Sequence, residues 1–385
     1  MSFSLILSTR VHFVEELFGG LDKVYDIHKW IGSLGFVFAL NHPMLLAIKA
    51  LPSLETAIMY VAPGSDLAYN LGVFAIYTML ASFVFMVFVK LQYQAWLFTH
   101  KFLGVSFILA GLHALTIGSD ISNNTLLKAW TLLFILLGTQ SFIYTLFFYK
   151  KFGPRFIYKI DKVQRLLDIV NLYLTPVHKK MKYKSGQFAY LSLVSSRLGG
   201  ESHPFTLSSS PLENELRLSV KILGDYTMNL RDLSKGSLAC VYGPYGKFGE
   251  PYYSKKTPRL IWVAGGIGVT PFLSMLREEN QNPSGKEIHF YYTCKTFDEA
   301  VFNEEIQQLV ANLTKVTYKL WVTETDKHVN AHEVMQTVQS ESGQTDDNTF
   351  VQICGPIKMM ESMRDQFINE GIKESNIYFE NFSML

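Results

Sequence analysis

Four long segments that carry almost no charge constrain this chain more than any other feature. Between Trp30 and Tyr149 seven residues are Asp, Glu, Lys or Arg: Lys49, Glu55, Asp66, Lys90, Lys101, Asp120 and Lys128. A helix needs about 20 mainly apolar residues to cross a bilayer. Four segments meet that length: 29–49, 70–89, 96–117 and 128–149. The alternative is four buried helices of a soluble protein, but soluble helices keep a polar face, and Leu71–Val89 and Trp130–Phe148 show almost none.

The rest of the chain has the charge density of a soluble protein. Overall 18% of the 385 residues are charged, against about 25% in typical domains, and the deficit lies in the N-terminal third. This division excludes a simple soluble enzyme, a disordered protein and a disulfide scaffold. The net charge of +2 gives no case for a nucleic-acid partner. The three cysteines (Cys240, Cys294 and Cys354) cannot all pair, which favours reduced thiols in a cytosol-like compartment.

Basic residues near the span ends predict the orientation, because cytoplasmic loops are rich in Lys and Arg. One side carries Arg10, Lys23, Lys29, Lys90, Lys101, Lys150, Lys151, Arg155 and Lys159. The other side carries Lys49 and Lys128, beside Glu55, Asp66 and Asp120. We therefore expect a multi-pass protein of the plasma membrane whose soluble part faces the cytoplasm. Ser2–Leu7 is apolar but too short to span, and it reads as the tail of a longer helix.

Four histidines bracket two of the predicted spans. His28 and His42 are 14 residues apart on the first span, and His100 and His113 are 13 apart on the third, which is ~20 Å along each helix. Neutral imidazole is a haem ligand. Two such helices side by side offer two pairs, His28 with His100 and His42 with His113, for two stacked b-type haems. Unrelated interfacial histidines or a proton path are the alternatives.

The helical period fits this arrangement imperfectly. Fourteen residues are close to four turns, whereas thirteen leave His113 well off the face of His100. A kink or π-bulge in the third span is then required, and Gly104 and Gly111 are its expected place.

Residues 151–253 predict a small antiparallel β-barrel, because short strands follow one another without long helices. The expected strands include Val163–Tyr173, Gln187–Val194 and Leu216–Ile222. Residues 254–385 instead predict an α/β domain. Its expected strands are Arg259–Ala264, Glu287–Thr293, Val316–Val322 and Thr349–Cys354, with a helix over Phe272–Glu279. With the helical membrane domain in 1–150, the chain is expected to have three domains.

A glycine turn, Gly265–Pro271, joins the first of these α/β strands to the helix. Such a turn lets backbone N–H groups approach a pyrophosphate, although glycine also makes tight turns without a ligand. Its neighbours are more specific. The barrel region contains Gly186-Gln187-Phe188, then His203–Pro211, Lys221, Gly224–Thr227 and Gly243–Gly246. The α/β region adds Cys354-Gly355-Pro356 with Met360, and Tyr378–Phe382.

In this order and spacing, these motifs resemble the ferredoxin–NADP reductase superfamily, and the chain from about residue 20 onward resembles the NADPH oxidase and ferric reductase family. The resemblance implies an FAD site at His203, Pro204, Phe205, Thr206, Ser208, Lys221, Gly224, Asp225, Thr227 and Phe382. It implies a nicotinamide-nucleotide site at Gly265, Gly266, Gly268, Val269, Thr270, Pro271, Lys295, Cys354, Gly355 and Pro356. Cys354, Phe382 and Thr206 are the expected catalytic residues, with Cys354 near the nicotinamide and Phe382 stacked on the flavin.

The function implied by the resemblance is electron transfer from NADPH through FAD and two haems to an acceptor on the outer face. Lys295 favours NADPH if it meets the 2′-phosphate; NADH stays possible if Lys295 is a solvated surface lysine. Dioxygen giving superoxide is the expected acceptor, and a ferric chelate is the alternative. Family oxidases carry a second histidine four residues after the outer ligand, where this chain has Leu46. The family has six spans, so the first two would be missing here.

Two further readings stay open: a haem subunit that feeds a periplasmic partner, and a membrane sensor with vestigial nucleotide domains. The intact flavin and nicotinamide motifs argue against the sensor. The sequence shows neither an EF-hand loop nor a proline-rich tail. We therefore expect activity without an obligatory cytosolic activator.

Overall fold

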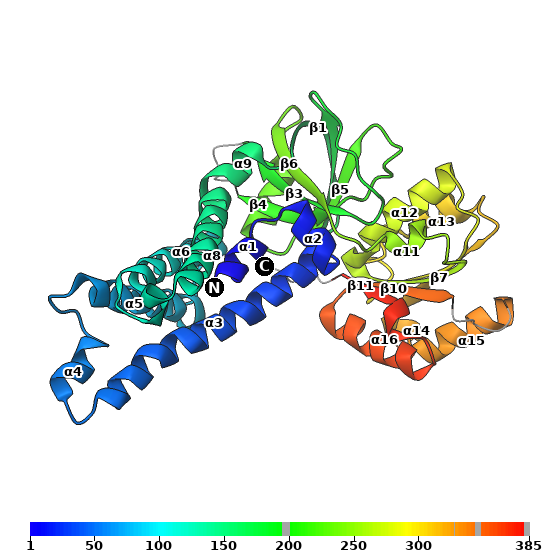
Figure 1. The fold of residues 1–385 in the computed structure, drawn as a ribbon. Coiled ribbons are helices and arrows are strands. Elements are labelled where there is room, and N and C mark those ends of the chain that lie inside the picture. The colour runs from blue at the N-terminus through cyan, green and yellow to red at the C-terminus, as the bar shows by residue number, and fades with distance from the viewer. Residues whose placement is uncertain (195–200, 327, 343–347, 381–385) are drawn as a thin grey trace. The chain divides into compact units, whose positions relative to one another are not determined.

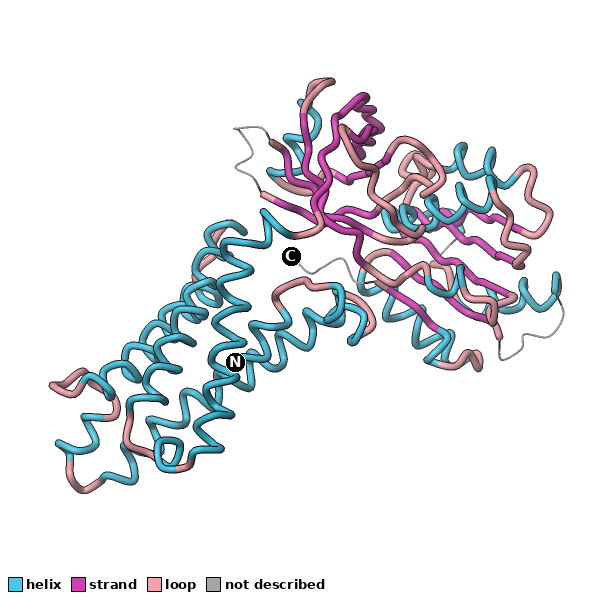
Figure 2. The backbone as a smooth tube through the Cα atoms, turned by 45° about the horizontal axis from the view of Figure 1, so that its top comes forward, coloured by secondary structure: helices cyan, strands magenta, loops and turns pink. Residues whose placement is uncertain are grey.

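The computed structural model describes residues 1–194, 201–326, 328–342 and 348–380, drawn as a ribbon in Figure 1. The chain divides into two compact units, Met1–Gly153 and Pro154–Met384. Figure 2, coloured by secondary structure, shows the first unit as helices and the second as strands with flanking helices.

The helices of the first unit confirm the predicted spans. They are α1 (Ser2–Leu7), α2 (His12–Phe18), α3 (Leu21–Ala50), α4 (Leu54–Met59), α5 (Leu67–Phe88), α6 (Tyr93–Thr116), α7 (Asp120–Asn123), α8 (Thr125–Ile143), the π-helix η1 (Tyr144–Phe148) and α9 (Tyr149–Phe152). Among the described residues, four stretches are long and apolar enough to cross a membrane: Leu21–Ala50, Leu67–Phe88, Tyr93–Thr116 and Thr125–Phe152. At most 22% of the most apolar window of each is buried within the protein, which suits contact with lipid.

Glycines allow α6 and α8 to pack closely. A Cβ atom on Gly104 would lie 2.2 Å from the Phe142 ring, and one on Gly138 would lie 2.6 Å from the Phe107 ring. Small residues at such crossings are typical of membrane helices, because they let the backbones approach. The π-bulge expected near Gly104 and Gly111 is not found: α6 is one continuous α-helix, and the π-turn η1 lies in the fourth span instead.

The first half of the second unit is the predicted antiparallel β-barrel. Its strands are β1 (Arg155–Leu166), β2 (Ile169–Pro176), β3 (Phe188–Leu193), β4 (Ser202–Thr206), β5 (Leu216–Lys221) and β6 (Leu238–Tyr245), with the short helices α10 (Asp225–Asn229) and η3 (Leu230–Asp232). The sheet order is β4-β3-β6-β1-β2-β5. A bridge between Leu207 and Leu218 joins the two edges of this sheet, which draws it toward closure.

One predicted strand, Val163–Tyr173, is wrong. Leu166 pairs with Ile169, so the segment is a hairpin whose two-residue turn is Leu167-Asp168. Leu167 has φ of 49°, a conformation that leucine rarely adopts. An apolar residue at a turn carries no glycine or proline signal in the sequence.

The second half is the predicted α/β domain. Its strands are β7 (Arg259–Gly265), β8 (Glu287–Cys294), β9 (Val316–Val322), β10 (Thr349–Cys354) and β11 (Ile377–Phe379). Its helices are α11 (Glu250–Tyr253), η4 (Gly266–Val269), α12 (Thr270–Gln281), α13 (Asn303–Val310), α14 (Thr323–Asp326), α15 (Ala331–Ser342), α16 (Ile357–Asn369) and η5 (Glu374–Asn376). The strands form a parallel sheet in the order β11-β10-β7-β8-β9.

Candidate functional site

The strand order places the two predicted nucleotide-binding segments side by side. From β7 the chain adds β8 and β9 on one side and then returns to add β10 on the other. Ligands of such sheets bind beyond the carboxyl ends of the strands, at the point where the order reverses. The glycine turn Gly265–Pro271 leaves β7 at that point, and Cys354-Gly355-Pro356 leaves β10 beside it, because Cys354 pairs with Ala264.

The glycines of the turn differ in what surrounds them. A Cβ on Gly268 would lie 2.3 Å from the carbonyl oxygen of Cys354, and one on Gly265 would lie 2.7 Å from the Met359 sulfur. Gly268 therefore packs the turn against the end of β10, and Gly265 packs it against α16. Gly266 has φ of +53°, and a Cβ there would meet no atom within 4 Å. This open backbone stands just before α12, where N–H groups favour a phosphate.

The remaining residues of this segment serve the fold. Val269, Thr270 and Pro271 are buried, and the Thr270 hydroxyl donates to the Ile267 carbonyl at 3.0 Å. Lys295 is exposed just beyond β8, and its carbonyl accepts from the Glu324 N–H at 3.2 Å. Contact of Lys295 with a 2′-phosphate stays a prediction.

Cys354 is fully buried at the end of β10. Burial, with the nearby Glu380 carboxylate, raises the pKa of the Cys354 thiol well above its ordinary value, so the thiol stays protonated at neutral pH. Glu380 is itself buried, and a Cβ on Gly246 would lie 2.6 Å from its Oε1 atom. Sequence inspection did not single out Glu380, although the Glu-Asn-Phe ending contains it.

Replacing Cys354 with alanine should slow flavin reduction by NADPH more than it lowers FAD content. A neutral thiol at the predicted nicotinamide site would help to hold the ring for transfer, and small displacements of the reacting atoms slow transfer greatly. Stopped-flow reduction and FAD content measure the two effects. Because the pKa of the thiol is raised, the wild-type rate should also show no Cys354 titration between pH 6 and about 9. Equal rates in the two proteins would reduce Cys354 to a packing residue.

Aromatic rings gather where the resemblance places the flavin. His203 and Phe205 lie on β4, with Pro204 between them. The Tyr226 ring lies 3.9 Å from the His203 ring and 6.3 Å from the Phe205 ring, centroid to centroid. His203 Nε2 also lies 3.2 Å from Glu201. Tyr226 extends the predicted set, because α10 carries it to β4.

The predicted pyrophosphate segment forms the start of α10. The Thr227 hydroxyl accepts from the N–H groups of Leu223 and Gly224 at 2.9 and 3.0 Å, so this turn is capped within itself. A Cβ on Gly224 would meet no atom within 4 Å, and Asp225 occupies the first turn. Lys221 pairs with Asp168 at 3.2 Å. The space around the Gly224 Cα atom is therefore open, while the Gly224 N–H is already bonded to Thr227.

The remaining predicted FAD residues are Thr206, Ser208 and Phe382. Thr206 is buried at the end of β4. Ser208 points into the interior, where its hydroxyl lies 2.9 Å from that of Ser219. Phe382 lies outside the described residues.

In the membrane unit, His28 and His100 come together. Their ring centroids lie 6.0 Å apart. Two metal–imidazole bonds of about 2 Å each, with about 1 Å from nitrogen to ring centre, also give about 6 Å. His28 Nδ1 lies 2.9 Å from the Ser4 carbonyl, and His100 Nδ1 lies 3.1 Å from the Met86 sulfur. Both rings engage through Nδ1, the arrangement that would leave Nε2 to an iron, and their separation is compatible with a bis-histidine haem.

His42 and His113 are placed differently. His113 Nδ1 lies 2.7 Å from the Ala68 carbonyl of α5, and a Cβ on Gly72 would touch its ring at 3.0 Å. Because α6 is regular, thirteen residues turn His113 away from the face of His100. His42 is exposed on α3. Among the described residues no ring contact joins His42 to His113, and no three His, Cys, Asp or Glu side chains cluster for a metal ion. A haem held by two histidines would not form such a cluster, because it needs only two ligating side chains.

Comparison with known proteins agrees with the three-part organisation. Residues 1–111 match the family "Ferric reductase like transmembrane component", 158–262 match "FAD-binding domain", and 262–365 match "Oxidoreductase NAD-binding domain". Dual oxidase 2 of Sus scrofa is 27% identical over 354 residues, which is 76% of this chain and 21% of that protein. Dual oxidase 1 of Caenorhabditis elegans is 31% identical over 182 residues, 39% of this chain and 12% of that protein.

A solved flavohemoglobin of Malassezia yamatoensis shares the fold, with a TM-score of 0.56, 21% identity, and coverage of 90% of this chain and 96% of that one. Fold and site together define a membrane protein with the FAD and nicotinamide domains of an NAD(P)H oxidoreductase. The chain thus combines a ferric-reductase-like transmembrane component with FAD-binding and NAD-binding oxidoreductase domains, and its sequence is similar to dual oxidases.

Proposed function

We propose that this protein is a transmembrane flavocytochrome that takes electrons from cytoplasmic NADPH, through FAD and two bis-histidine haems, to dioxygen on the outer face of the plasma membrane. The observation that carries the proposal is the His28–His100 pair among lipid-exposed helices. The same chain also carries the predicted nucleotide site, at the point where the strand order of the α/β sheet reverses. The net reaction converts NADPH and two O2 molecules to NADP+, a proton and two superoxide ions.

The chain's residues have distinct parts in this proposal. Gly266 and the start of α12 would hold the nucleotide pyrophosphate, and Cys354 would border the nicotinamide. His203, Phe205 and Gly224 would hold FAD, and His28 with His100 would hold the inner haem. When bound, FAD accepts a hydride and releases electrons singly, as haem iron requires. His42 and His113 would ligate the outer haem, which requires α3 and α6 to present these two rings to each other.

The orientation rests on the basic residues at the span ends. Lys150 and Lys151 lie in the last turn of the fourth span and Arg155 just after it, so the dehydrogenase unit would face the cytoplasm. NADPH and not NADH is proposed as donor because Lys295 stands exposed beyond β8. We propose no obligatory cytosolic activator.

A ferric chelate is the second candidate acceptor, favoured by Leu46 at the position where family oxidases carry a further histidine. Proteoliposomes with NADPH on the dehydrogenase side distinguish the two acceptors. Reduction of external cytochrome c that superoxide dismutase suppresses supports dioxygen. Reduction that resists the dismutase, with fast reduction of a ferric chelate, would replace dioxygen by the chelate. Failure to reduce any external acceptor would contradict transmembrane transfer.

Replacing Phe382 with alanine should loosen FAD and weaken the discrimination between NADPH and NADH. An aromatic ring that stacks on the flavin stabilises it and also blocks the nicotinamide, so its removal opens that face to either nucleotide. The FAD dissociation constant and the KM values for both nucleotides measure the two effects. If neither changes, Phe382 is a packing residue.

A further inference from the structure

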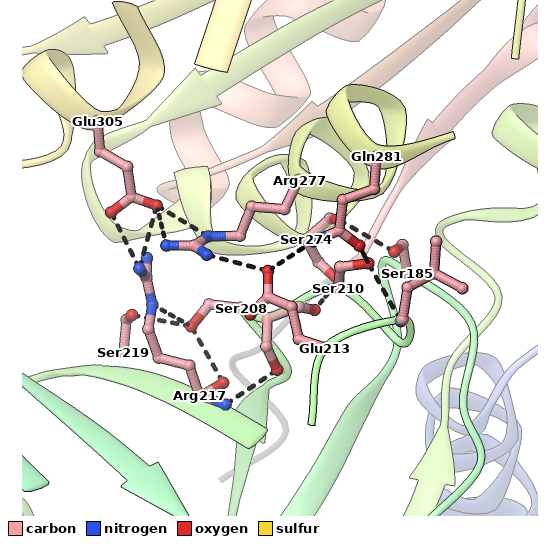
Figure 3. A network of polar contacts seen from close by, with 12 residues as sticks. Ser185, Ser208, Ser210, Glu213, Arg217, Ser219, Ser274, Arg277, Gln281 and Glu305 are labelled. Atoms are coloured by element: carbon pink, nitrogen blue, oxygen red, sulfur yellow. Dashed lines mark hydrogen bonds and ion pairs between the residues drawn. The ribbon is translucent and has the colours of Figure 1, made fainter. Parts of the chain in front are cut away.

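Four charged side chains join the β-barrel to the α/β domain inside the second unit (Figure 3). They alternate in sign: Glu213 before β5, Arg277 on α12, Glu305 on α13 and Arg217 on β5. Arg277 Nη1 lies 3.0 Å from Glu213 Oε1, and Arg277 Nη2 lies 2.8 Å from Glu305 Oε1. Arg217 Nη1 lies 3.0 and 2.9 Å from the two Glu305 oxygens. The Arg277–Glu213 and Arg217–Glu305 pairs each join the β-barrel to the α/β domain.

Arg217 is the most deeply buried of these four side chains. The Arg217 side chain is 2% exposed, and its guanidinium lies over the Phe302 ring of the α/β half at 5.6 Å. Burial alone would raise the pKa of Glu305, but Arg217 and Arg277 lower it below its ordinary value, so the carboxylate is ionised. A buried charge is costly without its partner. Here the carboxylate that pairs with Arg217 comes from the other half of the unit.

Helix α12 receives two more ties to the barrel. The Ser274 hydroxyl donates to the Ser209 carbonyl at 2.6 Å, and the Ser185 hydroxyl donates to Glu278 at 2.6 Å. Ser274, Arg277 and Glu278 lie within two turns of the helix. The N-terminus of α12 follows the glycine turn directly. Any shift of α12 on the barrel therefore moves the nucleotide turn relative to the FAD residues.

We propose that Arg217 and Glu305 are positioning residues for hydride transfer. Arg217 holds Glu305 of α13, and Glu305 in turn holds Arg277 of α12. The pair thereby fixes α12, and with it the glycine turn, at the place on the barrel where the nicotinamide would meet the flavin. This inference rests on the proposed function, because it requires that NADPH reduces FAD in this unit. A misplacement of about 1 Å costs roughly a hundredfold in rate, so a loosened tie affects the transfer step before it affects binding.

The test is stopped-flow reduction of the flavin in the full chain with Glu305→Gln. The matched control is Glu304→Gln, because Glu304 is its exposed neighbour on α13. We expect the limiting rate to fall about tenfold or more in Glu305→Gln, with FAD content and the NADPH dissociation constant within about twofold. The control should match the wild type. An unchanged limiting rate, or a loss that follows FAD content, would overturn the positioning role.

A second variant keeps the test decisive if Glu305→Gln fails to fold. Arg217→Met combined with Glu305→Met removes both charges and leaves neither buried alone, so folding is expected to survive. It should hold FAD and still reduce it slowly. If the single variants Arg217→Met and Glu305→Met both fold, their effects should not add in this double variant, because each removes the same tie. Additive effects, or a wild-type rate in the double variant, would overturn the inference. A wild-type flavin that NADPH does not reduce would instead contradict the proposed function itself.

Discussion

Replacing His28 with leucine should remove one haem from each chain and stop electron delivery to the outer acceptor. The His28 and His100 rings stand 6.0 Å apart, a separation at which both could ligate one iron. Leucine offers no ligand, and iron held on one side alone loses most of its binding. Haem per chain, by the pyridine assay, should fall from two to one, and NADPH-driven reduction of any external acceptor should fall to background. Flavin reduction should continue at the wild-type rate.

The controls for this prediction use other histidines. His100→Leu should remove the same haem, and the double variant His28→Leu with His100→Leu should lose no more than either alone. His178→Leu should keep both haems, because His178 is exposed in the second unit. Retention of two haems by His28→Leu would show that the pairing is wrong.

Replacing Gly268 with alanine should weaken NADPH binding at least about tenfold, because overpacking forces the backbone to move. A Cβ at this position would lie 2.3 Å from the Cys354 carbonyl oxygen, and a backbone atom cannot rotate away. The turn must then leave β10, and the phosphate site at Gly266 moves with it. We expect the free energy of unfolding to fall by about 1–3 kcal/mol. Nucleotide titration and thermal unfolding measure the two effects.

Gly285→Ala is the matched control for Gly268. Gly285 has φ of +77°, and a Cβ there would meet no atom within 4 Å. This change should cost about 1 kcal/mol of stability through the backbone alone and leave NADPH binding intact. Wild-type nucleotide affinity in Gly268→Ala would mean that the close approach to Cys354 is not needed for the site.

Composition and periodicity were sufficient to predict the four spans and four of the five parallel strands. The four spans follow from their lack of charge, since nothing else in the sequence runs apolar for 20 residues. The parallel strands Val316–Val322 and Thr349–Cys354 have the predicted bounds, because their apolar runs end at polar turns. The hairpin at Leu167 was missed because its turn residues are not those that turns usually select.

Contacts between distant residues could not be predicted. Arg217 and Glu305 are 88 residues apart, and an arginine within a strand pattern normally indicates a solvated face. The bond from His28 to Ser4 depends on α1, whose sequence shows only that it is too short to span. His113 illustrates a different limit: its spacing from His100 already indicated another face, and the structure keeps α6 regular, with His113 against Ala68 of α5.

The central claim is that electrons from NADPH reach haem through this one chain. The direct test is the visible spectrum of the purified protein, recorded without oxygen after rapid mixing with NADPH. We expect the flavin absorption to bleach first and the bands of reduced, six-coordinate haem to appear afterwards. A flavin that bleaches while the haem stays oxidised, or a purified protein that carries no haem, would contradict the central claim.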